Sequence, residues 1–494
     1  MDDLPRGVPD RKSGKDTTPD AEWMGQDELL GSSEYHYTPD KIFLGHLEGQ
    51  LLGIGDDRHV VLCAGSRAGK GRSMIVPNLI EYKGSVLAID PKAELANITA
   101  KRRAEGLHQR VLVLDPFGKA TGTAQNYKAV YNPMTLLHRG SRWIIEDAGL
   151  IADALIVPSG GDSHWDDSAR NFLEGVILHV ATSTLYPDEQ KNLVTVRDLI
   201  SGRFQQKRGK GSLEFLKNEI EDNAKECEAI DEDLAAALES CASDFFDKPE
   251  NERGSVLSTL RKHTKFLDYK AMREVLSGHD FDLSELKTAP NGTTIYLCLP
   301  VGRMPTCNRW FRLFVNLALE ALEREESKPE VPVLLCLDEF PVLGHMRQIE
   351  VAAGQIAGFG VKLLTVIQDL AQLKAIYKDR WETFMGNAGV LIFFGNNDVT
   401  TLEFIQKRLD KTTVTVSRKN EVTAQAINKG GSGVSWSNET HFLITIEEAS
   451  RIFGRSDEFK RQLVIHAGKK PIIMKRLHYD AHPYFSGKFE KASK

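Results

Sequence analysis

Apolar runs of strand length alternate along this chain with segments of helical periodicity. The runs lie at residues 59–63, 85–90, 110–115, 293–300, 331–340, 361–368 and 389–395. Strands that are apolar on both faces and separated by helices are typical of a parallel sheet covered on both sides. The pattern therefore predicts a doubly wound α/β fold with a mostly parallel sheet.

The strand pattern is absent between about residues 141 and 285, where apolar positions recur near the helical period. The clearest segments are SRWIIEDAGLIADALI, WDDSARNFLEGVILHVATS and DEDLAAALESCASDFF. We infer an all-α domain at 141–285, inserted between two parts of the sheet domain at 46–140 and 286–480. Residues 481–494 form a C-terminal tail. Residues 1–45 are rich in Asp, Gly, Pro, Lys and Ser, which predicts a mostly disordered lead.

The composition is that of an ordinary soluble globular protein. The 494 residues are 41% hydrophobic and 27% charged, and the formal net charge of −6 is small for this size and does not require a nucleic-acid partner. Six cysteines without CxxC pairing indicate reduced thiols and a cytosolic compartment. No apolar segment approaches the roughly 20 residues that span a bilayer. We therefore expect any contact with a membrane to come through a partner.

One stretch of the helical segment is strongly acidic. Residues 214–250 contain thirteen acidic residues and three lysines. Such a run is most often a solvated helix face, and its alternative is a docking surface for a basic polypeptide. We do not expect DNA to bind there, because the phosphates would be repelled.

The stretch HVVLCAGSRAGKGRSMIVPNL, residues 59–79, joins an expected strand to an expected helix through a loop of small residues. In a phosphate-binding loop, backbone N–H groups surround the phosphate oxygens and a lysine adds a positive charge. The candidate loop residues are Gly65, Ser66, Arg67, Ala68, Gly69, Lys70, Gly71 and Arg72.

This loop departs from the usual pattern at two positions. Ala64 stands where a first glycine is usual, and Gly71 stands where a hydroxyl normally contacts Mg²⁺. Ser73 comes two positions too late to replace that hydroxyl directly. We therefore expect water or Asp338 to complete the metal shell.

The run VPVLLCLDEF ends in Asp338 and Glu339. Hydrolysis of ATP needs one carboxylate that orients Mg²⁺ and another that polarises the attacking water. An acidic pair alone is more often a helix cap or a turn, but with a phosphate-binding loop in the same sheet it indicates an ATPase. Gln368 ends the strand VKLLTVIQ, where its amide can contact the γ-phosphate or, alternatively, cap the next helix.

Two further aspartates, Asp90 and Asp115, end strands at the edge where open α/β sheets bind ligands. Each is followed by proline, and Asp-Pro is first a turn signal. A structural role is the favoured interpretation for both.

Taken together, several segments resemble a known family. They are the loop at 59–79, SVLAIDPKAEL, VLVLDPFG, YNPM, LLCLDEFPVLGHM, GFGVKLLTVIQDLAQLKAIY and KKPIIMKRLHYD. They occur in the order seen in coupling proteins of type IV secretion systems, the TraG-like conjugation ATPases. The resemblance covers residues 50–480, with the helical insert similar in position more than in sequence.

The resemblance implies a RecA-like P-loop ATPase that forms a homo-hexameric ring. Such a ring passes DNA with its attached relaxase, or protein substrates, to the secretion channel, and the inserted all-α domain helps to select cargo. If the roles of the family's residues are carried over to this sequence, Lys70 would bind the β- and γ-phosphates of ATP and Asp338 would hold Mg²⁺. Glu339 would activate water, and Gln368 would sense the γ-phosphate. The ending Gly-Lys-Gly is common in this family.

Family members usually begin with membrane-spanning helices, and this sequence shows none. We therefore expect a cytoplasmic protein that partners recruit to the inner face of the bacterial inner membrane. An arginine finger from a neighbouring subunit could be Arg347, Arg380 or Arg408, and spacing does not choose among them.

Two alternative functions remain open. A cargo receptor or adaptor would use the nucleotide only to set its conformation, without motor activity. A chromosome-partition or DNA-packaging translocase would share Lys70 and Glu339, but it does not explain LDEFPVLG together with QDLAQLKAIY. The motor is the favoured interpretation, with single-stranded DNA as a candidate partner.

Overall fold

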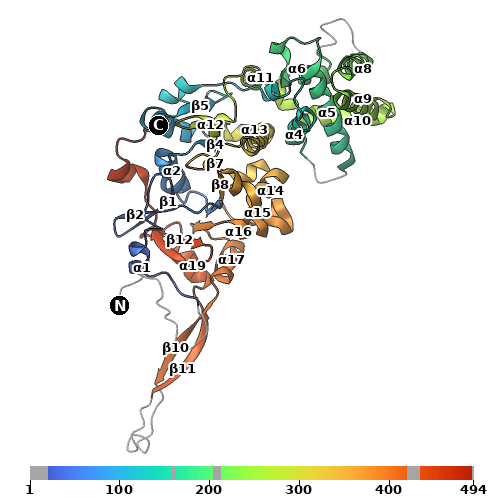
Figure 1. The fold of residues 1–494 in the computed structure, drawn as a ribbon. Helices are drawn as coiled ribbons and strands as arrows, with labels where there is room; N and C mark the ends of the chain where they lie inside the picture. Colours follow the sequence, from blue (N-terminus) through green and yellow to red (C-terminus); the bar gives the residue numbers. More distant parts are fainter. Residues whose placement is uncertain (1–20, 158–162, 204–212, 420–433, 492–494) are drawn as a thin grey trace, which may run out of the picture. The chain divides into compact units, whose positions relative to one another are not determined.

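The computed structural model of the chain describes residues 21–157, 163–203, 213–419 and 434–491 (Figure 1). Contacts divide the chain into two compact units. The first contains residues 1–83, 335–341 and 362–488, and the second contains residues 84–334, 342–361 and 489–494. Both units are thus built from segments that are far apart in the sequence.

In the first unit the strands lie in the order β2-β1-β13-β12-β9-β3-β8-β7. Their bounds are β1 Ile42–Leu47, β2 Gln50–Ile54, β3 Val60–Ala64, β7 Val333–Leu337, β8 Val361–Ile367, β9 Val390–Phe394, β12 Arg461–His466 and β13 Ile472–Lys475. Strand β3 is parallel to β8 and β9, whereas β12 is antiparallel to both β9 and β13. Strand β13 consequently runs in the direction of β3, and both end at the same edge of the sheet.

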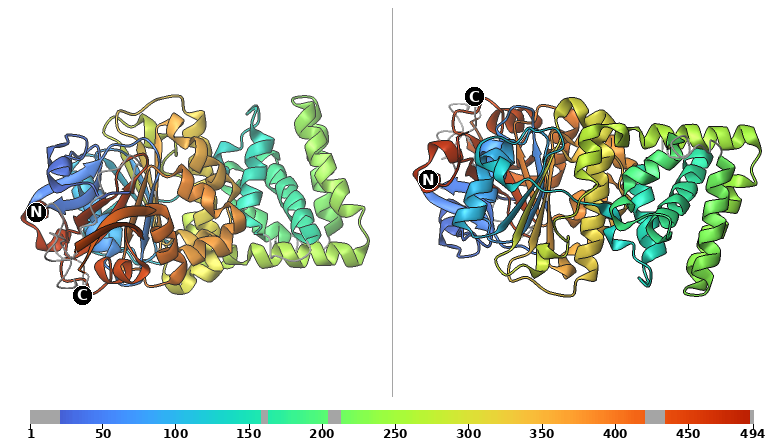
Figure 2. Two further views of the ribbon diagram at one scale, coloured as in Figure 1. Left: turned by 90° about the horizontal axis from the view of Figure 1, so that it is seen from below. Right: turned by 90° about the horizontal axis from the view of Figure 1, so that it is seen from above.

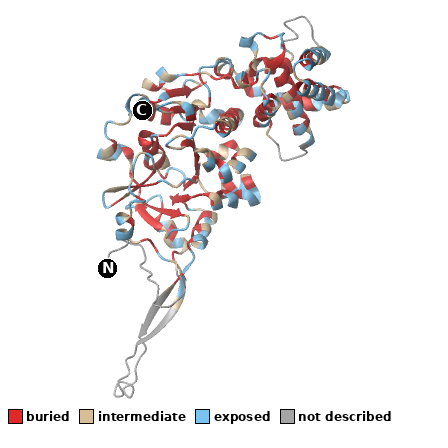
Figure 3. Cartoon of the chain, viewed as in Figure 1, coloured by how far each residue is buried: buried red, intermediate tan, exposed pale blue. Residues whose placement is uncertain are grey.

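The central strands of this unit are buried along their whole length. Every residue of β3, β7, β8 and β9 is buried, which is why these segments read as continuous apolar runs (Figure 3). The predicted α/β fold with a mostly parallel sheet is confirmed.

Side chains cap the starts of three of the helices of the first unit. The helices are α1 Gln26–Gly31, α2 Val76–Glu81, α15 Leu370–Tyr377, α16 Trp381–Asn387, α17 Val399–Leu409 and α19 Ile446–Ile452. The side chains of Asp369 and Asp398 accept backbone N–H groups at the starts of α15 and α17, and Thr445 and Glu448 form a capping box on α19. The antiparallel strands β10 (Lys411–Lys419) and β11 (Val434–Phe442) form a separate ribbon.

The second unit combines three parallel strands with most of the helices. The strands β4 (Val86–Asp90), β6 (Thr293–Cys298) and β5 (Arg110–Leu114) lie in the order β4-β6-β5. The helices are α3 Glu94–Lys101, α4 Ile144–Leu155, α5 Ser163–Thr182, α6 Leu193–Ile200, α8 Leu213–Glu228, α9 Glu232–Phe246, α10 Glu250–His263, α11 Lys270–Val275, α12 Glu285–Thr288, α13 Met304–Arg324 and α14 Arg347–Gln355.

Within the described parts of residues 141–285, every regular element is a helix. Helix α5 packs against α4, α9 and α10, and Figure 2 shows these helices lying together as a bundle, coloured green. The units nevertheless divide the chain differently from the sequence-based boundaries, since β4, β5 and β6 group with this bundle. None of the helices in the described ranges is long and apolar enough to cross a bilayer.

The acidic stretch at 214–250 lies on α8 and α9 and the turns that follow them. None of its acidic residues is buried. Helix α8 instead buries Leu216, Ile220 and Ala224, which recur at intervals of four residues. The acidic residues therefore occupy the solvent-facing side of these helices.

The predicted mostly disordered lead at 1–45 was wrong for residues 21–45. Trp23, Leu29 and Tyr35 are buried there, and β1 begins at Ile42. The hydroxyl of Tyr35 also lies 3.1 Å from Nδ1 of His466. A few buried aromatic and apolar side chains thus anchor a segment whose average composition is polar. Residues 1–20 lie outside the described ranges.

Candidate functional site

The loop after β3 is shaped by two glycines that have no substitute. A Cβ atom on Gly65 would lie 1.9 Å from the carbonyl oxygen of Gly395, so only glycine allows this close approach. Gly69 has φ +93°, a conformation that side chains rarely adopt. The chain then enters a helical segment, first a π-helical turn at Gly71–Ile75 and then α2.

Lys70 follows this loop and reaches the carboxylates at the end of β7. Its Nζ atom lies 2.8 Å from Oε1 of Glu339 and 3.5 Å from Oδ1 of Asp338. Lys70 is separated from both carboxylates by more than 260 positions in the chain. The structure thus brings together the lysine and the acidic pair that the sequence predicted for one site.

Gln368 completes the cluster from the end of β8. Its Nε2 atom donates a hydrogen bond of 3.1 Å to Oε2 of Glu339. The cap of the next helix is Asp369, whose side chain accepts the N–H of Gln372. Gln368 is therefore oriented toward Glu339, and the capping role belongs to its neighbour.

Asp338 has an unusual electrostatic environment. Burial is the largest influence and raises the pKa of its carboxyl group, while Lys70 lowers that pKa and the nearby charge of Glu339 raises it. The net result is a pKa above the usual value. A half-buried carboxylate with a raised pKa gains most from a second positive charge, such as a metal ion.

The other predicted loop residues take different positions. Ser66 and Arg67 are exposed, whereas Ala68 is buried against Gly395. Arg72 forms an ion pair with Asp480. The loop therefore presents its backbone and Lys70, with Arg72 bound to a segment near the C-terminus.

The residues of the loop fit a nucleoside triphosphate with Mg²⁺. A Cβ atom on Gly71 would meet no atom within 4 Å, so the space beside Lys70 is open. The hydroxyl of Ser73 donates a hydrogen bond of 2.9 Å to the carbonyl oxygen of Gly69, so its proton is already used within the chain. Asp338 and Glu339 supply the oxygen ligands that Mg²⁺ prefers.

Magnesium would need ligands beyond these two carboxylates. Among the residues that the structure describes, no group of three or more His, Cys, Asp or Glu side chains could hold a metal ion. Mg²⁺ commonly keeps several waters and binds substrate phosphates together with one or two carboxylates. The donor set here is of that kind.

Asp90 and Asp115 have structural roles, as favoured from the sequence. One carboxylate oxygen of Asp90 accepts the N–H of Ala96 at 2.8 Å, and one of Asp115 accepts the N–H of Ala120 at 2.6 Å. Both carboxylates therefore fix the turn that follows their strand.

Sequence reasoning missed three residues beside the loop. Arg476 donates to the carbonyl oxygen of Ala68, Asp480 pairs with Arg72, and His478 lies near Gly69. All three belong to the segment KKPIIMKRLHYD, which the family resemblance included without any role. No signal in the sequence pointed to these residues beyond their place in that segment, because Arg476 and Asp480 lie about 400 residues from the loop residues that they contact.

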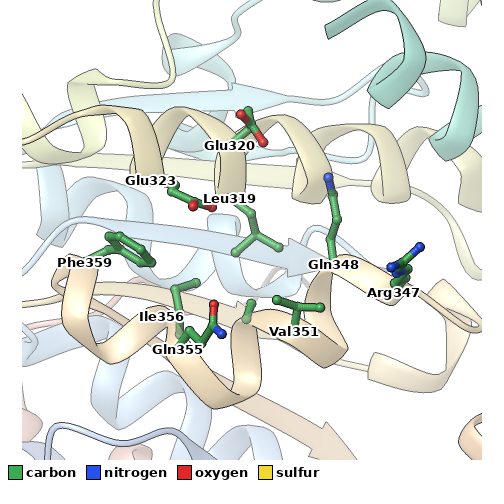
Figure 4. Close-up of a pocket in the computed structure, with 10 residues that line it drawn as sticks. Leu319, Glu320, Glu323, Arg347, Gln348, Val351, Gln355, Ile356 and Phe359 are labelled. Carbon is green, nitrogen blue, oxygen red and sulfur yellow. The ribbon is translucent and has the colours of Figure 1, made fainter. Parts of the chain in front are cut away.

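The three arginines considered as fingers are all exposed. Arg380 ends a short 3₁₀ turn before α16, and Arg408 lies in the last turn of α17. Arg347 begins α14 in the second unit, beside a pocket of about 180 Å³ (Figure 4). The apolar part of that pocket comes from Leu319, Val351, Ile356 and Phe359. Exposure does not choose among the three arginines.

Comparisons with known proteins agree with the family inferred from the sequence. The curated relatives include the conjugal transfer protein TraG of Escherichia coli, 26% identical over 453 residues that cover 87% of this chain and 68% of TraG. Protein VirD4 of Rhizobium radiobacter is 26% identical over 456 residues, covering 90% of this chain and 60% of VirD4. This chain thus spans about two thirds of the length of these relatives.

Solved structures with the same fold include two of the plasmid coupling protein TrwB. TrwB in complex with the non-hydrolysable ATP analogue ADPNP has a TM-score of 0.62 and 12% identity, covering 94% of this chain and 96% of TrwB. TrwB in complex with ADP and Mg²⁺ has a TM-score of 0.59 and 14% identity, covering 87% and 88%. At this identity the likeness shows the RecA-like P-loop fold.

A sequence profile described as "Type IV secretory system Conjugative DNA transfer" matches residues 18–493, almost the whole chain. The chain therefore belongs to the family of type IV secretory system proteins for conjugative DNA transfer.

Proposed function

We propose that this chain is an ATP-hydrolysing coupling protein of a type IV secretion system. It recruits DNA with its attached relaxase, protein substrates, or both, and delivers them to the secretion channel. The observation that carries the proposal is the cluster in which Glu339 bonds Lys70 through one carboxylate oxygen and Gln368 through the other. An adaptor that only binds nucleotide has no need for a carboxylate held in this way.

Each residue of the cluster has a distinct role in this proposal. The loop from Gly65 to Arg72 surrounds the phosphates, and the Nζ atom of Lys70 binds the β- and γ-phosphate oxygens. The carboxylate of Asp338 holds the metal. Bound Mg²⁺ and ATP would supply charge neutralisation and the phosphoanhydride to be hydrolysed.

Glu339 and Gln368 act at the water side of the reaction. A carboxylate oxygen of Glu339 accepts a proton from the attacking water, as a general base does. Gln368 holds the other oxygen of Glu339 and changes partners when the γ-phosphate is present or absent. Loss of the γ-phosphate is then transmitted to α15, which begins two residues later.

The cellular context of the proposal follows the family. The chain works as a homo-hexameric ring at the inner face of the bacterial inner membrane, recruited there by partners. The helices at 141–285 recognise cargo, with the exposed acidic residues of α8 and α9 available to basic segments. Single-stranded DNA is a candidate partner of the ring.

The test is steady-state ATP hydrolysis by the purified chain, with and without single-stranded DNA, beside the variants Lys70→Ala and Glu339→Gln. We expect DNA-stimulated turnover that falls by about 100-fold or more in both variants. Tight ATP binding without turnover, at concentrations that form rings and with DNA present, would instead identify a nucleotide-dependent receptor without motor activity.

A further inference from the structure

The segment after β13 lies against the phosphate-binding loop of the first unit. Arg476 is buried, and its Nη1 atom donates a hydrogen bond of 2.8 Å to the carbonyl oxygen of Ala68. Its guanidinium also stacks on the ring of Phe394, 4.6 Å from the ring centre. The backbone beyond β13 is thus fixed to the loop at this point.

His478 is the side chain nearest to the open face of Gly69. Its Nε2 atom lies 3.7 Å from the position that a Cβ on Gly69 would occupy, and apart from Gly69 and its chain neighbours no other described residue has a heavy atom within 4 Å of that position. The imidazole is half-buried. The imidazole therefore lies beside Gly69, the loop residue that directly precedes Lys70.

A bidentate ion pair holds the same segment to the start of the helix. Nη2 of Arg72 lies 2.8 and 2.7 Å from the two carboxylate oxygens of Asp480, and Nε lies 3.1 Å from one of them. Paired contacts of this geometry fix orientation better than a single contact does. Arg72 follows Lys70 by two positions, so the clamp lies just past the phosphate-binding lysine.

The strand order places two groups of residues on opposite sides of β3. Glu339 and Gln368 follow β7 and β8, on one side of β3, and they mark where the γ-phosphate is attacked. Residues 476–480 follow β13, on the other side of β3 and at the same edge of the sheet. A nucleotide with its γ-phosphate at Glu339 would then extend along the loop toward the second side.

We propose that His478 contacts the ribose or base of the bound nucleotide, and that the Arg72–Asp480 pair positions the segment that carries it. This inference rests on the proposed ATP site and adds its nucleoside half. The polar ring of the histidine suits a sugar hydroxyl or the face of a purine.

The charges around His478 agree with this assignment. Burial lowers the pKa of the imidazole most, Arg72, Lys460 and Arg476 lower it further, and only Asp480 raises it. The ring is consequently uncharged at neutral pH. An uncharged imidazole suits the uncharged nucleoside half of the ligand better than its phosphates.

The test compares a ligand that has a nucleoside with one that has none. Binding of ATP and of inorganic tripolyphosphate, both with Mg²⁺, is measured by titration calorimetry for the full chain and four variants. The variants are His478→Ala, Asp480→Ala, Lys70→Ala and the control His138→Ala, which alters an exposed histidine of the second unit. Retained tripolyphosphate binding also reports that a variant is folded.

We expect His478→Ala and Asp480→Ala to weaken ATP binding by about tenfold and tripolyphosphate binding by less than about twofold. Lys70→Ala should weaken both ligands, and His138→Ala neither. The inference alone is overturned if His478→Ala binds ATP as the unmodified chain does, or loses both ligands equally. If Lys70→Ala leaves both ligands bound as before, the proposed ATP site is overturned as well.

Discussion

The Nζ atom of Lys70 lies 2.8 Å from Oε1 of Glu339, so the cation assigned to the phosphates is paired with the carboxylate assigned to the water. The γ-phosphate and Glu339 would compete for the same ammonium group. In the proposed mechanism, binding of ATP would release Glu339 to act as a base, and occupancy of the site would thus be coupled to its activation.

This competition predicts the nucleotide affinity of Glu339→Gln. The neutral side chain holds Lys70 less strongly, so ATP should bind as tightly as before or up to about fivefold more tightly, as expected for a partly exposed ion pair. Equilibrium binding of a fluorescent ATP analogue measures the effect. Weaker binding than that of the unmodified chain would contradict the competition.

Gln368 offers a second prediction, because its amide restrains the other oxygen of Glu339. The change Gln368→Ala should lower kcat by about tenfold and leave KM nearly unchanged, since a misplaced base slows the chemical step more than substrate binding. Steady-state kinetics separate the two constants. The matched control is Gln372→Ala on α15, which should behave as the unmodified chain, and a rise in KM alone would assign Gln368 to substrate binding.

The sequence was sufficient for the central strands and for the meeting of Lys70, Glu339 and Gln368. Strands β3, β7, β8 and β9 are buried on both faces, so each left an uninterrupted apolar run in the sequence. The loop and the acidic pair have fixed spacing relative to such runs. Parallel strands end at one edge of a sheet, which is why Lys70, Glu339 and Gln368 could be expected to meet there.

Features that depend on distant pairing were beyond the sequence. Strand β13 is only four residues long, and its place beside β1 and β12 comes from hydrogen bonding across the sheet. The contact between Arg72 and Asp480 joins residues 408 positions apart. Neither composition nor periodicity carries information about such partners. Residues 21–45 were misjudged for the same reason, since their few apolar side chains are buried by distant elements.

The close approach of Gly65 to Gly395 gives a third prediction. A Cβ on Gly65 would overlap a backbone carbonyl, so Gly65→Ala should lower the free energy of unfolding by about 1–3 kcal/mol and reduce ATP binding. Chemical denaturation and calorimetry measure the two effects. In contrast, a Cβ on Gly71 would meet open space, so the free energy of unfolding of Gly71→Ala should stay within about 0.5 kcal/mol of that of the unmodified chain. Equal losses in the two variants would contradict this geometry.

The half-buried carboxyl group of Asp338 gives a prediction about pH. Burial raises its pKa in the folded chain above the value of about 3.9 in the unfolded chain. Between these two values the folded state binds more protons than the unfolded state, so the contribution of Asp338 to stability falls as the pH rises. The penalty of holding this charge in the folded chain therefore grows as the pH rises.

The change Asp338→Asn removes that penalty. In buffer without nucleotide or Mg²⁺, the variant should melt about 2 °C higher than the unmodified chain at pH 7, and the difference should shrink as the pH is lowered toward 4. The control Asp57→Asn alters an exposed carboxylate, and its melting temperature should follow that of the unmodified chain across the range. A lower melting temperature for Asp338→Asn at pH 7 would mean that attraction to Lys70 outweighs the cost of burial. Added Mg²⁺ and ATP should reverse the order, because only the unmodified chain then gains a metal ligand at this position.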